Sequence, residues 1–342
     1  MSSVPLPNLS GLPTPGSPNA DQGGLGSQRS GDLLARAAQR GRPRSGPARV
    51  LTERLIRWSL FLCATLSVIT TFTIILILLK ETVTFFAMPE ASLMDFLFGL
   101  EWTPLVGAEV HFGIWPLVCG TVLVSAVAAA FALPVGLITA VYLSEYAPSK
   151  VRAVLKPILE ILAGVPTVVY GFFALSVITP GLKWFHDGFA SFNAASAGLA
   201  VGIMILPIVC SLSEDALRAV PKALREGAYA LGSTRFDVSV RVVLPAALSG
   251  IVAAFLLAIT RAIGETMIVA LAAGGRPQLT VNPANETQTM TAFMVQIFTG
   301  DAQAGSVEYQ SSYAVAFVLF VMTLGLTLVG NAILRRFREE YD

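Results

Sequence analysis

The segment SLSEDALRAVPKALREGAYALGSTRFDVSVRVVLPAALSG, residues 211–250, joins two long apolar runs through a short stretch dense in charged residues. Its apolar residues recur at i, i+4, i+8 and i+11, which predicts one apolar face on a helix: Val220, Leu224, Ala228 and Leu231. Pro221 suits the first turn of that helix, and Gly232 suits its end, where a positive φ is needed. A second amphipathic stretch, 236–243, follows. We therefore expect two short helices, separated by a glycine, at a membrane surface.

The composition on either side of this loop is that of a membrane protein. Hydrophobic residues make up 54% of the 342 residues and charged residues only 13%, against about 25% in soluble domains. A transmembrane helix needs about 20 apolar residues, because lipid offers its backbone no hydrogen bonds. Six such runs predict an all-α polytopic membrane protein with helices near 58–79, 114–143, 153–179, 195–213, 246–273 and 311–334.

The first 50 residues are rich in Ser, Pro, Gly and Arg and lack apolar periodicity, so we expect a disordered basic tail. We interpret the first apolar run as an uncleaved helix, because it is too long for a signal peptide. The sequence contains no G-x-x-x-x-G-K-[ST] loop for ATP. Three dispersed cysteines and two distant histidines predict no metal site and no cofactor. Nothing in the charge indicates nucleic acid.

The distribution of Lys and Arg predicts the orientation. Basic residues gather in the tail, in the loop after the second helix, in the loop 214–245 and at the C-terminus, whereas the alternate segments are poor in them. By the positive-inside rule, both termini and the loop 214–245 are cytoplasmic.

Two charged residues fall inside the fifth predicted helix. We expect that helix to run continuously from Pro245 past Arg261, with Glu265 four residues further on the same face. Each charge at this depth costs about 2.5–3.5 kcal/mol on insertion scales, which favours a role in a solute pathway. Two readings stay open and are compatible: Arg261 and Glu265 neutralise each other, or they line that pathway.

The chemistry of these two groups suggests a cargo. A guanidinium presents a planar fork of donors suited to phosphate or sulfate oxygens. A carboxylate beside it repels a fully ionised anion but accepts a hydrogen bond from a protonated one, and phosphate keeps a P–OH group near neutral pH. We hypothesise that Arg261 attracts the anion and that Glu265 tests for its proton.

The loop also carries a recognisable motif. Glu226-Gly227-Ala228, three residues, Gly232, nine residues, then Val242 and Leu244-Pro245 resemble the EAA loop of ABC importer permeases. Gly227 and Val242 depart from its usual Ala and Ile. The resemblance implies a cytoplasmic coupling helix between helices 4 and 5 that docks on an ATP-hydrolysing subunit. The alternative is a basic helix lying on anionic lipid.

Further motifs narrow the resemblance, which covers about residues 55–338. The chain is similar to PstC-type permeases of the phosphate-specific importer in three segments: FGIWP at 112–116, GVPTVVYG at 164–171 and RAIGET at 261–266. That resemblance implies a type I ABC importer permease fold and passage of inorganic phosphate past Arg261 and Glu265. It also implies a bacterial cell membrane and three partners: a second, PstA-type permease, a homodimeric PstB-type ATPase and an extracytoplasmic PstS-type phosphate-binding protein.

The expected organisation is a tail over 1–50, a first transmembrane helix with an extracytoplasmic loop over 51–112, and a permease core over 113–338. Three alternatives remain. One is a permease for another oxyanion, such as sulfate or molybdate. Another is an ion-coupled secondary transporter, for which paired discontinuous helices and an internal repeat would be expected; the sequence indicates neither. The last is a membrane scaffold or sensor without transport.

Overall fold

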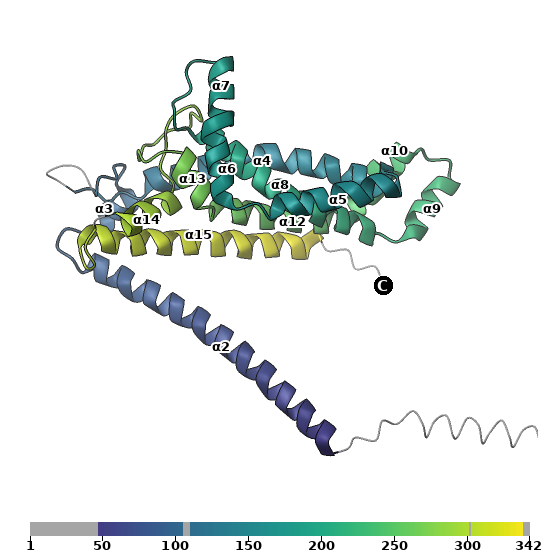
Figure 1. Cartoon of the computed structure of the whole chain (residues 1–342), viewed down its shortest axis with the longest axis horizontal. Coiled ribbons are helices and arrows are strands. Elements are labelled where there is room, and N and C mark those ends of the chain that lie inside the picture. Colours follow the sequence, from purple (N-terminus) through teal and green to yellow (C-terminus); the bar gives the residue numbers. More distant parts are fainter. Residues whose placement is uncertain (1–46, 105–109, 301, 338–342) are drawn as a thin grey trace, which may run out of the picture. The chain divides into compact units, whose positions relative to one another are not determined.

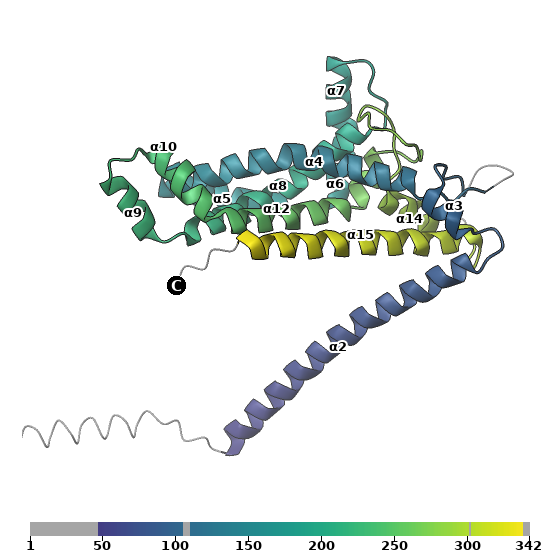
Figure 2. The same cartoon turned by 180° about the vertical axis from the view of Figure 1, so that it is seen from behind.

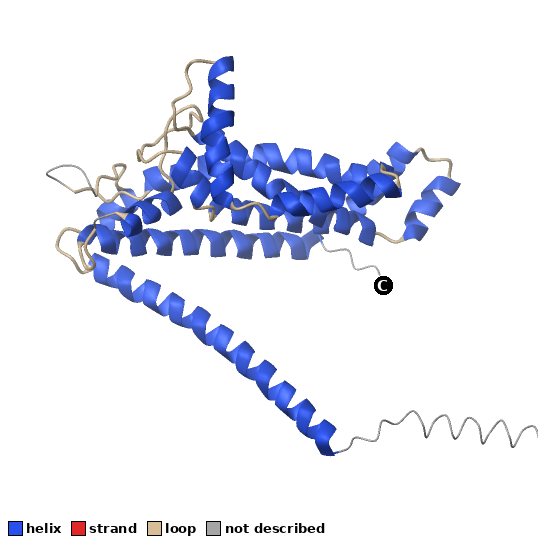
Figure 3. Cartoon of the chain, in the orientation of Figure 1, coloured by secondary structure: helices blue, strands red, loops and turns tan. Residues whose placement is uncertain are grey.

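The computed structural model describes residues 47–104, 110–300 and 302–337. Those residues are helical or irregular, without strands (Figure 3), and one isolated antiparallel bridge joins Trp102 to Phe112. The predicted all-α class is confirmed. Most of the predicted tail, residues 1–46, lies outside the described residues. The helices are α2 Pro47–Phe86, α3 Leu93–Phe98, α4 Trp115–Val141, α5 Ser149–Ala163, α6 Thr167–Phe173, α7 Thr179–Phe185, α8 Ala194–Ala219, α9 Lys222–Ala230, α10 Arg235–Val238, α11 Leu244–Ala246, α12 Leu248–Ile263, α13 Met267–Ala272, α14 Met290–Thr299 and α15 Val307–Phe337.

Three π-helical turns extend or link these helices: η1 Tyr142–Tyr146, η2 Ala174–Ile178 and η3 Ser239–Val243. Within the described ranges, five helical segments are long and apolar enough to cross a bilayer, and a bent pair, 235–246 with 248–263, would make a sixth. The count of six transmembrane helices therefore stays a prediction. The five are Leu51–Phe86, Trp115–Tyr146, Thr167–Phe185, Ala194–Ala219 and Val307–Arg335.

The chain divides into two units between residues 71 and 72. The described part of the first unit is the N-terminal portion of α2. In the second unit α4 packs along α8, α12 packs on α8, and α15 packs on α12 (Figures 1 and 2). Helices α4 and α8 approach closely at Gly198, where a Cβ would lie only 2.6 Å from the Val127 Cβ. Small residues are typical of such close contacts between membrane helices.

The second unit has two distinct ends. Helices α3 and α14 lie toward one end and α9 toward the other, with α15 running from the first end toward the second (Figure 1). Helices α6 and α7 stand across the direction of the bundle (Figure 1). We refer to these as the α14 end and the α9 end.

The structure corrects the third predicted helix. The run 153–179 is not one helix, because α5 stops at Ala163 and α6 starts at Thr167. Pro166 has no N–H to donate to the carbonyl of Leu162, so a continuous helix would leave that oxygen without its usual partner. The Tyr170 hydroxyl donates to the Leu162 oxygen instead, at 2.7 Å. The segment that can span is 167–185.

The fifth predicted helix is also wrong as a single element. It bends by 69° between 235–246 and 248–263, and it breaks again after Ile263 before α13 begins at Met267. The structure thus contains discontinuous helices. The sequence indicated none, which was an argument against a secondary transporter, and that argument no longer holds.

A buried carboxylate holds α5 against α8. Glu214 is 1% exposed, and its carboxylate lies 3.3 Å from Arg152 Nε, 3.5 Å from Lys156 Nζ and 3.6 Å from an Arg218 nitrogen. Burial alone would lower the pKa of Lys156, but its hydrogen bond to Asp215 and the charge of Glu214 raise it above its ordinary value. Glu214 lies inside α8, so the charged loop begins later than predicted, near Val220.

We expect Glu214→Gln to destabilise the protein by about 3 kcal/mol, because three cations would lose their shared counterion. This is the lower end for a broken buried pair, since Arg152 and Lys156 are partly exposed. The control is Asp215→Asn, which removes an exposed carboxylate that contacts Lys156 and should cost less than about 1 kcal/mol. Thermal unfolding in detergent measures both; equal losses would contradict the central role of Glu214.

Candidate functional site

The predicted pair of short helices is present. Helix α9 begins after Pro221, which occupies the N-cap position rather than the first turn, and it ends before Gly232. Gly232 has a φ of 84°, as the sequence predicts, and a Cβ there would be strained. The second helix, α10, begins after its N-cap Thr234, whose hydroxyl accepts from the Asp237 N–H at 3.2 Å.

Helix α9 is tied to the bundle by Arg225. Its guanidinium donates to the carbonyl oxygens of Val220 at 2.8 Å and Leu217 at 2.7 Å, which end α8. The same group pairs with Glu145 at 3.2 Å. Because Glu145 lies in the turn η1 that extends α4, this arginine joins α9 to two long helices at once. Neither Arg225 nor Glu145 belongs to the EAA motif. The sequence contains one indication of Glu145: an acid without an evident basic partner at the end of a predicted span.

Much of the surface of α9 and its neighbours lacks a partner within the described chain. No residue of α9 is buried. Leu231 is 89% exposed and Phe236 65% exposed. Glu226 and Gly227 are exposed as well, and a Cβ on Gly227 would meet nothing within 4 Å. Of the predicted apolar face, Val220 is buried and Ala228 half-buried, whereas Leu224 and Leu231 face outward. Such a surface suits another protein.

The motif ends at a bend rather than at the start of a straight helix. Leu244 and Pro245 lie in the three-residue helix α11, and the chain turns by 69° at Ala247 before α12 begins. The expected continuous helix from Pro245 to Arg261 is therefore wrong. The loop residues lie in α9 or just after it (Glu226, Gly227, Ala228 and Gly232) and in α11 (Leu244 and Pro245), whereas Arg261 lies in the last turn of α12 and Glu265 follows that helix.

Glu265 lies in the break between α12 and α13 and is 8% exposed. One carboxylate oxygen, Oε1, accepts from the backbone N–H of Met267 at 3.1 Å and of Ile268 at 3.3 Å. The backbone oxygen of Glu265 accepts from the Thr291 hydroxyl at 2.7 Å. The carboxylate thus satisfies the first donors of α13. Its other oxygen, Oε2, accepts no hydrogen bond from the described residues.

Arg261 lies in the last turn of α12 and is exposed. Within the described ranges its guanidinium forms no ion pair, with Glu265 or with any other acid. The two residues are not on one helical face because the helix ends at Ile263, between them. Mutual neutralisation is therefore wrong for this conformation. Among the described residues Arg261 is therefore an unpaired cation in a predominantly apolar segment.

The two helix breaks lie in neighbouring parts of the bundle. Helix α6 packs on α13, and a Cβ on Gly171 of α6 would lie 2.8 Å from the Leu271 side chain. Val165 packs against the same apolar cluster that holds Ala262 and Ile268. The sequence did not indicate the roles of Tyr170 and Thr291. Tyr170 donates to the Leu162 oxygen across the first break, and Thr291 donates to the Glu265 oxygen, which lies 26 residues earlier in the chain.

Comparison with known proteins assigns a family. Residues 132–339, more than half of the chain, match the family "Binding-protein-dependent transport system inner membrane component". The chain is 32% identical over 261 residues to "Probable ABC transporter permease protein YqgH" of Bacillus subtilis, with 76% of this chain and 84% of that protein covered. It is 31% identical over 262 residues to "Phosphate transport system permease protein PstC" of Mesorhizobium japonicum, covering 71% and 78%.

Solved structures agree on the fold. A bacterial ABC transporter "involved in the import of the acidic polysaccharide alginate" superposes with a TM-score of 0.59 at 16% identity, covering 85% of this chain and 100% of that one. An inward-facing MetNI methionine ABC transporter gives a TM-score of 0.51 at 20% identity, covering 66% and 98%. The chain belongs to the binding-protein-dependent transport system inner membrane components and is a multi-pass permease of the ABC importer class.

Proposed function

We propose that this permease carries inorganic phosphate into the cytoplasm, powered by ATP hydrolysis on a separate subunit. The observation that carries the proposal is Arg261, whose guanidinium has no counterion among the described residues and lies in the last turn of α12 beside a helix break. Its planar fork of donors suits a tetrahedral oxyanion. The names of relatives support the cargo, since "Phosphate transport system permease protein PstC" of Mesorhizobium japonicum aligns over 71% of this chain.

Glu265 has two functions in this proposal. Oε1 caps α13, and Oε2 is left to accept a hydrogen bond from a protonated anion. A fully ionised sulfate would be repelled by the carboxylate, whereas phosphate offers a P–OH group. In this proposal Arg261 attracts the anion, and Glu265 discriminates phosphate from sulfate while its Oε1 stabilises the break between α12 and α13.

The exposed surface around α9 is the proposed docking site for the ATPase. Its motif residues are Glu226, Gly227, Ala228, Gly232, Leu244 and Pro245. Because the chain bends at Ala247, we propose that movement of α9 reaches α4 and α8 mainly through Arg225 and its contacts to Glu145 and Leu217. The proposed ATPase is a PstB-type homodimer.

The remaining partners follow from the class. One solved relative is described as an alginate transporter "in complex with alginate pentasaccharide-bound periplasmic protein". By analogy we propose a PstS-type phosphate-binding protein at the α14 end and a PstA-type second permease beside this chain. Both termini lie in the cytoplasm of a bacterium in this proposal, with 51–112 as first helix and outer loop and 113–338 as the core.

We expect Arg261→Gln to reduce phosphate uptake into vesicles holding the whole complex by at least about tenfold, because one charge-assisted contact is worth about 1.5–3 kcal/mol. Lys150→Gln removes an exposed cation from α5 and should leave uptake unchanged. Uptake of sulfate but not phosphate by the wild-type complex would overturn the cargo. Uptake without the ATPase would favour a secondary transporter.

Two substitutions at Glu265 separate its proposed functions. Glu265→Gln keeps an oxygen that can cap α13 but removes the charge, so we expect preserved stability and a reduced preference for phosphate over sulfate. Glu265→Ala also removes the cap and should destabilise by about 1 kcal/mol. Competition uptake and thermal unfolding measure the two effects. If the Glu265→Gln complex transports with an unchanged preference for phosphate over sulfate, the hypothesis that Glu265 tests for the proton of the anion is wrong.

Two glycines, Gly227 within α9 and Gly232 just after it, test the docking proposal. Gly232→Ala places a Cβ at a φ of 84°, where strain of about 1–2 kcal/mol disfavours the turn, so ATP-driven uptake should fall. Gly227→Ala is the matched control, because its Cβ has free space and the helix gains about 1 kcal/mol. ATPase activity coupled to uptake is the measurement. Equal loss in both variants would indicate that the turn has no special part.

A further inference from the structure

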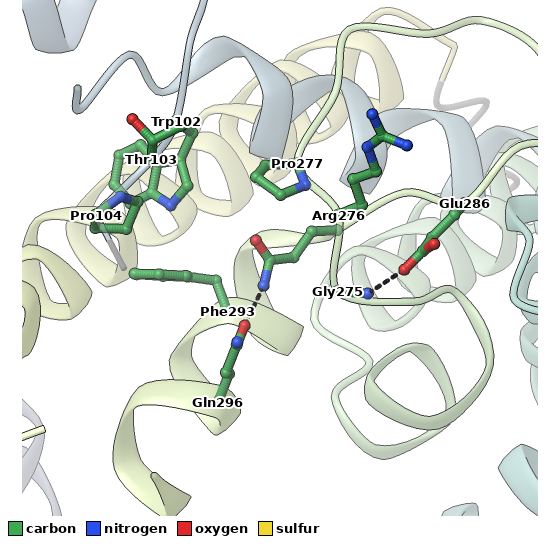
Figure 4. Close-up of a pocket in the computed structure, with 10 residues that line it drawn as sticks. Trp102, Thr103, Pro104, Gly275, Arg276, Pro277, Glu286, Phe293 and Gln296 are labelled. Atoms are coloured by element: carbon green, nitrogen blue, oxygen red, sulfur yellow. Dashed lines mark hydrogen bonds between the residues drawn. The ribbon is translucent and has the colours of Figure 1, made fainter. Parts of the chain in front are cut away.

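A cavity lined in part by α14 lies toward the α14 end, and Figure 4 shows the residues that line it. Its volume is about 620 Å³. It is lined by the segment after α3, by the connection from α13 to α14 and by α14 itself: Trp102, Thr103, Pro104, Gly275, Arg276, Pro277, Glu286, Gln288, Phe293 and Gln296. A tetrahedral oxyanion is much smaller than this volume, so it could enter with part of its hydration water.

Three donors at this cavity have no acceptor among the described residues. Trp102 is 2% exposed, and its indole Nε1 is buried without a hydrogen bond. Such a donor costs about 1–3 kcal/mol unless something accepts from it. Gln288 donates to Gln296 Oε1 at 2.5 Å, which fixes the Gln296 amide and leaves its NH₂ group free. Arg276 is exposed and forms no ion pair or hydrogen bond within the described chain.

Glu286, the carboxylate among the described lining residues, is held away from that arginine. Its Oε1 accepts from the Gly275 N–H at 3.0 Å, and its side chain lies against Gly274, where a Cβ would clash with the Glu286 Cγ. Figure 4 shows the Arg276 and Glu286 side chains pointing apart. Arg276 therefore keeps its charge available, and Glu286 keeps its second oxygen free as an acceptor.

A second cavity continues from this one toward the break in the fifth span. It has about 320 Å³ and shares Gly275, Glu286, Gln288 and Gln296 with the first. It reaches Ala270 of α13, whose N–H donates to the Thr266 oxygen at 3.0 Å, one residue beyond Glu265. The two cavities thus lead from the α14 end toward α13.

We propose that the cavity at Trp102 and Arg276 is an outer binding site for a protonated tetrahedral oxyanion, occupied before the anion reaches Arg261. Arg276 supplies the charge, the Trp102 indole and the Gln296 amide supply neutral donors, and Glu286 accepts from the hydroxyl of the anion. The identity of that anion as phosphate rests on the proposed function. The anion would bind first at Arg276 and then at Arg261.

The test measures phosphate binding to the permease complex in nanodiscs, without ATP and without binding protein, by line broadening in phosphorus NMR. Arg261→Gln removes the inner cation, so binding that remains reports on the outer site. We expect this variant still to bind phosphate and the double variant Arg261→Gln with Arg276→Gln to bind at least about tenfold more weakly. Arg276→Lys should restore part of the affinity, because it restores the charge without the planar fork.

Matched measurements separate the possible failures. Arg276 is exposed and makes no bond within the described chain, so Arg276→Gln should unfold at the same temperature as wild type. Trp102→Phe should weaken binding while keeping an aromatic ring in place. If Arg261→Gln abolishes binding, or if Arg276→Gln has no effect, the outer site is overturned. If excess sulfate displaces phosphate completely and binds more tightly, the site stands as an oxyanion site and the phosphate assignment fails.

Discussion

The backbone of this protein has to satisfy its own hydrogen bonds wherever it crosses lipid, and that requirement explains the side chains at both helix breaks. At the first break Pro166 cannot donate to the Leu162 oxygen, and the Tyr170 hydroxyl does so. At the second break the N–H groups of Met267 and Ile268 have lost their helical acceptors, and the Glu265 carboxylate accepts from both. Irregular backbone within a bilayer is tolerated where it is buried in protein or lines a cavity. The second break holds Glu265, which the proposed function places on the solute pathway.

Because of this requirement, the two charged residues at the second break, Glu265 and Arg261, have different contacts. Glu265 is committed through one oxygen to the backbone of α13, whereas Arg261 has no counterion among the described residues. An ion pair between them would have masked the charge of Arg261. Holding the carboxylate on backbone donors leaves the guanidinium unneutralised at close range, so an anion can bind it without first displacing an acid. The same arrangement recurs at the α14 end, where the Gly275 N–H holds Glu286 and Arg276 has no partner within the described chain.

Hydropathy predicted the long helices well, because runs such as 115–141 and 313–330 are mainly apolar and contain no charged residue. Gly232 was predictable too, since a glycine after an amphipathic stretch signals a positive φ. The breaks were not, because Gly164, Val165 and Gly264 are as compatible with an apolar run as with its interruption. Glu214 was assigned to the loop because hydropathy ends a span at its first charge. Its partners Arg152 and Lys156 lie about 60 positions earlier, on a helix that was expected to be part of another span.

The shortness of α12 has a consequence for how the protein is made. Its 16 residues extend about 24 Å, less than the roughly 30 Å of hydrocarbon that a transmembrane helix has to span, and their last turn carries the charge of Arg261. Such a segment partitions poorly into lipid by itself. Helices α4 and α8 precede it in the chain and supply the surface on which it packs. A bilayer crossing by α12 would therefore be a cooperative step of biogenesis, in which helices already inserted provide the contacts that the short helix needs.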